Sequence, residues 1–345
     1  MKEINVIGLD LAKNIFQVYG VNRKGERTAN RKLSRKQMLS YFSNLPPCLI
    51  GIEACGNSHY WARELIGLKH QVKMMNPKFV KPYLKGNKND YNDAEAICEA
   101  VQRPNMRFVE LKTTEQQSVL HLHKSRQLLV KARVGLSNHI RALLSEFGLI
   151  LAQGVKVFEH ETPVLITDEC NGLPPLSRQT LWTMWESYQQ HKRQIVELEK
   201  ELTIWHKDNE DSSRLAEVPG IGVHTATALV GKLGNGRTFR NGREVAAFVG
   251  LVPKQASSGG KEKLLGISKR GDGYLRRLLV QGAKSVIRHV RRRLLAGLPG
   301  GNPWVESLLE RKHPNKVAIA LANKMARIAW VILAREEHYR QATMN

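Results

Sequence analysis

The chain has 345 residues, and its 54 Lys and Arg residues outnumber its 31 Asp and Glu residues, which gives a formal net charge of +23. So large a positive charge predicts a polyanionic partner. The length favours two or three domains over a single core. Neither a run of about 18 apolar residues nor a secretory signal sequence is evident, so we expect a soluble, intracellular protein.

The cysteines and histidines do not predict a zinc site. The four cysteines, none of them in a CxxC pair, fit free thiols in a reducing compartment better than disulfides. His121 and His123 form the closest histidine pair, but no Cys or carboxylate partner lies near them in the sequence. We interpret this pair as a feature of a helix surface.

The first hundred residues alternate between apolar runs and amphipathic segments. The runs predict strands at residues 4–9, 15–21, 26–33, 49–52 and 71–75, with helices at 34–44, 58–68 and from residue 90 onward. Three consecutive strands followed by alternating helices and strands is the element order of the RNase H-like fold, a mixed sheet flanked by helices. The N-terminal part is therefore predicted to be an α/β domain.

Four acidic residues lie where these elements end or begin: Asp10 and Glu53 close two strands, and Asp90 and Asp93 open a helix. The pair alone is typical of a helix start, where the helix dipole favours acids. In an RNase H-like sheet, however, the two strands are neighbours, so we expect all four carboxylates to converge. Converging carboxylates need cations to offset their repulsion, which predicts a catalytic Mg²⁺ site.

The middle of the chain carries two long helical patterns, at residues 114–147 and 177–205, separated by a Pro-containing stretch at 161–175. Apolar residues recur along the second at nearly heptad intervals. The two patterns predict an antiparallel, coiled-coil arm, which is either a spacer or an oligomerisation element. We expect an acidic linker at 207–213 to end the arm.

The remaining residues are strongly basic and predicted to be mainly helical. Val218-Pro-Gly-Ile-Gly222 before a helical run predicts a helix-hairpin-helix element, whose glycines let backbone N–H groups approach a phosphate. Between residues 254 and 293, twelve Lys and Arg residues face only two acids, which favours phosphate binding over a merely solvated surface. The candidate nucleic-acid-binding residues are Gly220, Gly222, Lys254, Lys261, Lys269, Arg270, Arg276 and Arg277.

Five stretches carry a resemblance to a known family. They are Gly8-Leu-Asp-Leu-Ala-Lys-Asn14, Ile52-Glu-Ala-Cys-Gly56, Lys88-Asn-Asp-Tyr-Asn-Asp-Ala-Glu-Ala96, Val218-Pro-Gly-Ile-Gly222 and Gly250-Leu-Val-Pro-Lys-Gln-Ala-Ser-Ser-Gly-Gly260. In this order, and over nearly the whole chain, they resemble the DEDD transposases of the insertion-sequence family one-ten, and most of all its eleven-eleven branch.

The resemblance implies a RuvC-like N-terminal domain whose catalytic and metal-binding residues are Asp10, Glu53, Asp90 and Asp93. It also implies a C-terminal transposase domain with a catalytic serine. Ser258 is the matching residue. Ser257 leaves an ambiguity of one position, and we favour Ser258 because it directly precedes Gly259.

The resemblance further implies recombination of element DNA with target DNA, guided by a non-coding RNA made from the element. The serine would be the nucleophile and form a covalent phosphoserine; because a free hydroxyl is a poor nucleophile, metal at the carboxylates would activate it. Dimers assembling into tetramers are implied, and a composite site shared by two protomers is one expectation. Candidate RNA contacts are Lys78, Lys81, Lys85, Lys88, Lys124, Arg126, Lys131 and Arg133.

We therefore predict a RuvC-like DEDD domain at residues 1–110, a coiled-coil arm at 111–207 and a transposase domain at 208–345, in the bacterial cytoplasm and at the nucleoid during action. Two rival interpretations stay open. One is a metal-dependent nuclease or junction resolvase, in which Ser258 only lines a flexible loop. The other is a non-catalytic architectural protein that binds nucleic acid, in which Asp90 and Asp93 only begin a helix.

Overall fold

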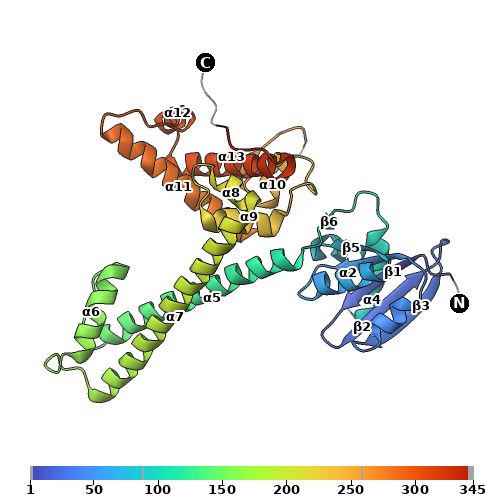
Figure 1. Cartoon of the computed structure of the whole chain (residues 1–345), viewed down its shortest axis with the longest axis horizontal. Helices are drawn as coiled ribbons and strands as arrows, with labels where there is room; N and C mark the ends of the chain where they lie inside the picture. Colours follow the sequence, from blue (N-terminus) through green and yellow to red (C-terminus); the bar gives the residue numbers. More distant parts are fainter. Residues whose placement is uncertain (1–2, 88, 258, 341–345) are drawn as a thin grey trace. The chain divides into compact units, whose positions relative to one another are not determined.

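The computed structural model describes residues 3–87, 89–257 and 259–340, in two compact units, Met1–Thr113 and Thr114–Asn345 (Figure 1). Each unit has its own buried apolar clusters. The second unit contains both the long helices of the arm and the C-terminal core. The division at residues 110 and 207 into three domains stays a prediction.

The N-terminal unit is built on a six-stranded sheet with the order β3-β2-β1-β4-β5-β6. The strands are β1 Val6–Leu11, β2 Ile15–Val21, β3 Arg27–Ser34, β4 Leu49–Glu53, β5 Gln71–Met75 and β6 Phe108–Val109. Strands β1, β4 and β5 are parallel, and the remaining pairs are antiparallel. This mixed α/β sheet is consistent with the predicted RNase H-like DEDD domain. The two-residue β6 was not predicted, because so short an edge strand carries no periodic signal.

Helices cover both faces of this sheet. The helical segments are α1 Met38–Ser43, α2 Ser58–Gly67, α3 Pro77–Val80, the 3₁₀ turn Lys81–Tyr83 and α4 Asp90–Val101. Successive residues of a strand point to opposite faces. Ile7 and Leu9 of β1 accordingly pack in one apolar cluster with Trp61 of α2, whereas Val6 packs in another with Ile97 of α4. Residue parity along β1 and β4 therefore decides which helix a side chain faces.

The arm consists of α5 Thr114–Ser145 and α7 Pro175–Asp208, which pack against each other. The beginning of α5 lies against the end of α7, since Leu120 clusters with Leu202, and the end of α5 lies against the beginning of α7, since Leu144 clusters with Leu181. The two helices are therefore antiparallel, as predicted. Their description as a coiled coil stays a prediction.

Two predictions about the arm are corrected. The Pro-containing stretch at 161–175 was predicted only to separate the two long helices, but its first part belongs to a further helix: α6 spans Val155–Thr167 and contains Pro163, whereas residues 168–174 are not helical. Burial of Phe158 against Trp185 and Tyr188 offsets the cost of a proline inside the helix.

The expected acidic linker is also helical. Helix α7 reaches Asp208, and α8 spans Glu210–Ala216 after a break at Asn209. The side chain of Asn209 caps α8 by accepting a hydrogen bond from Ser212 N–H at 2.9 Å. Acids in the first turn of α8 are favoured by the helix dipole, so the segment that looked like a solvated linker begins a helix.

The C-terminal core contains α9 Val223–Leu233, α10 Gly242–Phe248, α11 Gly273–Leu295, α12 Pro303–Arg311 and α13 Pro314–Arg335. Helix α13 is long and apolar enough to cross a membrane by length and composition. It is instead a core helix, because Val317, Met325 and Leu333 are buried in the main apolar cluster of this unit. A two-stranded antiparallel ribbon, β7 Pro253–Gln255 and β8 Leu264–Ile267, lies between α10 and α11 in the chain.

Candidate functional site

Asp10 and Glu53 lie at the ends of two adjacent parallel strands. The register of β1 and β4 pairs Leu9 with Ile52, so Asp10 and Glu53 are the next residues along each strand. Neighbouring strands are about 4.8 Å apart. Both side chains are half-buried and, by strand parity, face α4. The predicted convergence of these two strand ends is therefore present in the structure.

Two glycines allow α4 to lie very close to this face of the sheet. A Cβ atom on Gly8 would overlap the carbonyl oxygen of Ala94, and one on Gly51 would lie 2.8 Å from Cβ of Val101. Any other residue at these positions would force the helix away. Neither glycine was predicted to have a role, although an isolated glycine inside a strand often marks a close approach of backbone.

The direction of α4 brings its first turn to the carboxylate edge. Ala94 lies over Gly8, and the Sγ atom of Cys98 lies 3.9 Å from the carbonyl oxygen of Val6, so α4 runs antiparallel to β1. The residues that precede Ala94 therefore lie toward the end of β1 that carries Asp10. Asp90 and Asp93 occupy this first turn.

Asparagines fix the start of the helix. Asn89 caps α4 by accepting a hydrogen bond from Asn92 N–H at 2.8 Å, and the Asn92 amide donates to the carbonyl oxygen of Asn87 at 2.7 Å. Asp90 is exposed and lies 3.7 Å from the ammonium group of Lys32 on β3. Lys88 lies outside the described residues.

The carboxylate edge fits a hard cation such as Mg²⁺ through two carboxylates. Mg²⁺ commonly binds proteins through one or two carboxylates and completes its shell with water and phosphate oxygens. Asp10 and Glu53 supply such a pair. The expected meeting of all four carboxylates is not seen, because no three His, Cys, Asp or Glu side chains within the described ranges form a group that could hold a metal ion.

The Val218–Gly222 hairpin joins α8 to α9, and its glycines have different surroundings. Gly220 has a φ of +91°, and a Cβ atom there would lie 2.9 Å from the carbonyl oxygen of Gly282 on α11. Gly222 is exposed and is the N-cap residue that directly precedes α9. Packing against α11 thus explains Gly220, and the phosphate-binding role of the hairpin stays a prediction for Gly222 and the first turn of α9.

The serine candidates belong to the segment that connects β7 to β8 in the chain. Ser258 lies outside the described residues. Ser257 is exposed, and its hydroxyl oxygen accepts a hydrogen bond from the Gln255 amide at 3.0 Å. Every residue of β7 and most of β8 is exposed. The ribbon therefore contributes little buried surface of its own.

The base of this ribbon, in contrast, is tightly locked. Gly271 has a φ of +86°, and a Cβ atom there would overlap the carbonyl oxygen of Phe248. Asp272 N–H donates to the same oxygen at 3.0 Å, and the Arg276 guanidinium donates to the Val249 carbonyl oxygen at 2.9 Å. These contacts join the end of α10 to the start of α11.

Asp272 is the cap of α11 and a second anchor of the base. Its carboxylate accepts hydrogen bonds from the N–H groups of Tyr274 and Leu275, both at 2.9 Å, and lies 3.0 Å from the Lys232 ammonium. Burial would raise the pKa of Asp272, but the Leu275 hydrogen bond and the Lys232 charge outweigh it and hold that pKa below its ordinary value. The cap is therefore anionic at neutral pH.

The candidate nucleic-acid-binding cations differ in what holds them. Lys254, Lys261, Lys269 and Arg270 are exposed on or beside the ribbon. Arg277 is exposed and donates to the Gln127 amide oxygen of α5 at 3.0 Å. Arg276, as shown above, has a structural role that its sequence context did not reveal.

A basic stripe runs along the solvent face of α11. We define it as the exposed residues Arg277, Lys284, Arg288, Arg291 and Arg292. They recur at helical spacing opposite the buried side chains Leu279, Ala283, Ile287 and Val290. Helix α11 contains no acidic residue, so this face has strong positive charge.

His123 corrects the interpretation of the histidine pair. Its ring is 1% exposed, and its nitrogens lie 2.8 Å from the Tyr274 hydroxyl and 3.0 Å from the Thr227 hydroxyl. Thr227 donates to the Val223 carbonyl oxygen at 2.8 Å, so it accepts from His123 Nε2–H, and Tyr274 donates to Nδ1. Burial lowers the pKa of His123 to about 4, aided by the positive charges of His224, Arg126 and Lys232. This neutral histidine links α5, α9 and α11.

Another arm cation, Arg126, was a candidate RNA contact. Its guanidinium donates to the Glu199 carboxylate of α7 at 2.7 Å, so it joins the two long helices. The same carboxylate lies 3.6 Å from His224 of α9. Arg126 is thus part of the packing between the arm and the C-terminal core.

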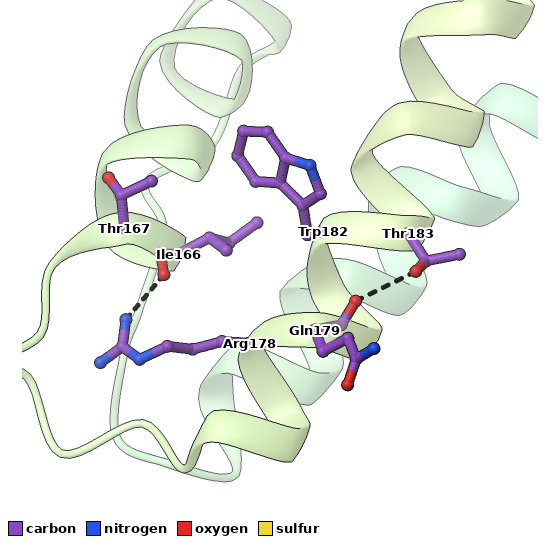
Figure 2. A pocket seen from close by; sticks show the side chains of 6 residues that line it. All are labelled: Ile166, Thr167, Arg178, Gln179, Trp182 and Thr183. Atoms are coloured by element: carbon purple, nitrogen blue, oxygen red, sulfur yellow. Dashed lines mark hydrogen bonds between the residues drawn. The ribbon is translucent and has the colours of Figure 1, made fainter.

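A hollow of about 470 Å³ lies between α6 and α7 and is wide open to solvent (Figure 2). Figure 2 shows Trp182 and Arg178 beside it, with the Arg178 guanidinium donating to the Ile166 carbonyl oxygen at 2.6 Å. None of the predicted site residues lines the hollow. We therefore do not assign it to the catalytic site.

Comparisons with known proteins agree with these features. The model of the DEDD transposases of IS110 elements matches residues 7–148, and the model described as the transposase IS116/IS110/IS902 family matches residues 212–296. The first match contains all four DEDD candidates. The second contains the hairpin, the ribbon and α11.

Three curated relatives align over nearly the whole chain. A probable family 20 transposase of Pseudomonas aeruginosa is 45% identical over 335 residues, covering 97% of this chain and 98% of the relative. The transposase for insertion sequence element IS1111A of Coxiella burnetii is 42% identical, covering 99% and 92%. The transposase for insertion sequence element IS1328 of Yersinia enterocolitica is 42% identical, covering 96% and 97%. The resemblance is confirmed, and the chain belongs to the IS110 family of transposases.

Proposed function

We propose that this transposase cuts and rejoins element and target DNA with a carboxylate site in the N-terminal unit and a serine nucleophile on the ribbon. The observation that supports the proposal is the close approach of α4 at Gly8 and Gly51, which brings the first turn of α4, with Asp90 and Asp93, toward the end of the sheet that carries Asp10 and Glu53. A solvated helix start would not require two strand glycines beneath the same helix.

Asp10 and Glu53 would hold Mg²⁺, and Asp93 and Asp90 would extend the anionic edge from the helix. Bound there, Mg²⁺ would acidify a hydroxyl group and reduce the charge on a phosphate. Half-burial of Asp10, Glu53 and Asp93 limits the water around them and strengthens their electrostatic interactions. The same carboxylates repel a phosphate unless a cation is present, so the edge by itself discourages unproductive DNA binding.

In the proposed attack by Ser258, one phosphoester bond forms for each one that breaks. The Ser258 oxygen forms a bond to phosphorus, loses its proton and displaces a deoxyribose oxygen, which leaves as a hydroxyl group. Attack by a DNA hydroxyl on the phosphoserine then restores the serine and rejoins the strand, so no outside energy source is needed. The exposed strands on either side of the segment that contains Ser258 support this role, because DNA can reach them.

We further propose that an element-encoded non-coding RNA selects the DNA. The basic stripe and the exposed cations of the ribbon suit phosphate contacts, which position a nucleic acid without reading its sequence. Specificity would then come from base pairing, as in other RNA-guided systems. We place the protein in the bacterial cytoplasm as a dimer or a tetramer of two dimers, with the arm as the oligomerisation element.

The decisive experiment traps the covalent adduct. The intact protein is mixed with Mg²⁺, element DNA, target DNA and RNA transcribed from the non-coding flank of the element, and DNA-linked protein is resolved under denaturing conditions. We expect an adduct with the parent and with Ser257→Ala, and none with Ser258→Ala or Asp93→Asn. Omission of the RNA should abolish the adduct as well.

Other outcomes distinguish the rivals. Cleavage that persists without any adduct in Ser258→Ala supports the metal-dependent nuclease. Loss of the adduct in Ser257→Ala alone moves the nucleophile by one residue. Binding without cleavage in both the parent and Asp93→Asn supports the architectural protein.

A further inference from the structure

Arg35 lies at the same edge of the sheet as the carboxylates. It directly follows β3, its N–H donates to the Asn14 carbonyl oxygen at 2.9 Å, and its guanidinium lies 3.5 Å from the Lys13 carbonyl oxygen. Lys13 and Asn14 belong to the turn that connects β1 to β2, just beyond Asp10. Arg35 is thereby held beside the end of β1.

Two aromatic rings of α2 lie next to this guanidinium. The central carbon of Arg35 lies 5.1 Å from the ring centroid of Trp61 and 5.8 Å from that of Tyr60. The Tyr60 and Trp61 rings make an edge contact at 5.1 Å, and Trp61 makes another with Phe16 at 5.1 Å. Trp61 is 2% exposed and Tyr60 is 42% exposed. The exposed Tyr60 ring and the exposed Arg35 guanidinium therefore both lie against the buried ring of Trp61.

This cluster lies close to Glu53 in the chain and in the fold. Helix α2 begins at Ser58, shortly after β4 ends at Glu53, so Tyr60 in its first turn is near the carboxylate edge. The carboxylates face α4, whereas Tyr60 belongs to the helix on the opposite face. A DNA strand that crosses the edge can therefore have a phosphate on one side and a base on the other.

The chemistry of the cluster suits an unpaired nucleobase. Exposed aromatic rings bind single strands by stacking, and a guanidinium adds a cation–π contact and a phosphate hydrogen bond. Bases inside a duplex are already stacked on both sides. Lys13 and Lys36, both exposed, add positive charge to the same surface.

We propose that Tyr60 and Arg35 stack an unpaired DNA base next to the phosphate held at the Asp10–Glu53 edge, an inference that rests on the proposed function. Tyr60 supplies the ring, and Arg35, fixed by the Lys13–Asn14 turn, supplies the planar cation. The two would be positioning residues for the strand, because the proposed reaction uses the carboxylates and the serine and neither of these two side chains.

The test is photocrosslinking of the full-length protein to a short oligothymidylate that carries one 5-iodouracil, followed by mass spectrometry of the digested protein. We expect the main adduct on Tyr60. Tyr60→Phe should keep it, whereas Tyr60→Ala should lose it and bind the oligonucleotide at least about fivefold more weakly. Arg35→Lys keeps the charge but loses the planar group, so its binding should fall between the two.

A control variant tests whether the crosslinking and the binding are specific to Tyr60. Trp182→Ala removes an exposed aromatic ring on the arm and should change neither crosslinking nor affinity. Three outcomes would each overturn the proposal. Tyr60 could crosslink equally to a duplex of the same sequence, or to an oligouridylate but not to the DNA. The affinity of Tyr60→Ala for the oligonucleotide could also equal that of the parent. The readout does not require cleavage. A parent protein that crosslinks at Tyr60 but forms no serine adduct would refute the proposed serine chemistry and leave the stacking site intact.

Discussion

The carboxylate edge and the serine ribbon are positioned in opposite ways. Asp10, Glu53 and the start of α4 are held by contact between the helix and strand glycines, so their placement is part of the packed core. The ribbon has a rigid base at Gly271, Asp272 and α11 but an exposed pair of strands. The carboxylate edge is therefore fixed by packing in the core, whereas the strands of the ribbon are exposed and fixed only at their base. Under the proposed function, we expect the carboxylates to be in place before DNA binds and the serine to take its final position against DNA.

The strongest way to break this comparison is Gly8→Ala. The new methyl group overlaps the Ala94 carbonyl oxygen, so α4 and its acids must move away from Asp10. Because misplacement of catalytic groups by about 1 Å can cost about a hundredfold in rate, we expect DNA cleavage to slow by about that factor. The measurement is the single-turnover cleavage rate of the intact protein.

A second substitution that makes room for α4 tests whether slower cleavage comes from the displaced helix or from a general loss of stability. Gly51→Ala brings a methyl group to 2.8 Å from Val101 Cβ and should also slow cleavage, and Val101→Gly in the same chain should restore much of the rate because it removes that Cβ atom. Gly67→Ala is the matched control, since nothing lies within 4 Å of its new methyl group. Parent-like cleavage by Gly8→Ala would show that α4 is not positioned in this way.

We expect the next largest effect from a substitution at Gly271, in the base of the ribbon. Gly271→Ala introduces a methyl group at a φ of +86° and against the Phe248 carbonyl oxygen, and we expect it to cost about 1–3 kcal/mol of stability. The serine adduct should be lost. Binding of DNA, measured in the absence of cleavage, should persist. Thermal unfolding and adduct trapping are the two measurements.

Gly266→Ala is the comparison variant on the ribbon itself. It lies in the exposed strand β8, and nothing is within 4 Å of its new methyl group. We expect parent-like stability and adduct formation. A larger loss in Gly266→Ala than in Gly271→Ala would reverse the distinction between a rigid base and an adaptable ribbon.

His123 makes the C-terminal core sensitive to acid. Its pKa is about 4 when folded, against about 6.5 when unfolded, so the unfolded chain binds more protons between these values. Stability is therefore full above about pH 6.5 and falls as the pH drops toward 4, by up to about 3 kcal/mol. His123→Gln can hydrogen-bond to both Tyr274 and Thr227 without titrating, so its melting temperature should depend less on pH. The same change at the exposed His121 should leave the parent profile unaltered.

The fold and the acidic residues of the N-terminal unit were predictable for a physical reason. Buried strands are apolar runs, and an acid directly after such a run, as at Asp10 and Glu53, marks the edge of a sheet. The sequence could not show how closely α4 lies against the sheet, or that its first turn points toward that end of β1. Gly8 and Gly51 carried the signal, but a strand glycine is informative only once the helix above it is known.

The C-terminal unit was harder to predict. The strands of the ribbon are short and exposed, so neither apolar alternation nor length distinguishes them from a loop. Arg276 and Arg277 are adjacent and chemically identical, yet only the first is tied to the Val249 carbonyl oxygen. Local sequence could not show which of the two arginines has this contact, because the difference depends on which face of α11 each occupies.

The smallest effect, and the sharpest test of that difference, is the salt dependence of DNA binding. Arg288 lies in the exposed stripe of α11, so Arg288→Gln should weaken duplex binding and reduce the slope of log affinity against log salt by about 0.9. Arg276→Gln should instead leave the slope unchanged and lower the melting temperature, because it removes a half-buried donor to Val249. Titrations of labelled DNA at several salt concentrations, with thermal melts of the same samples, measure both. If Arg276→Gln reduces the slope as Arg288→Gln does, the base of the ribbon also contacts phosphate, and the rigid region would then bind DNA as well as support the serine.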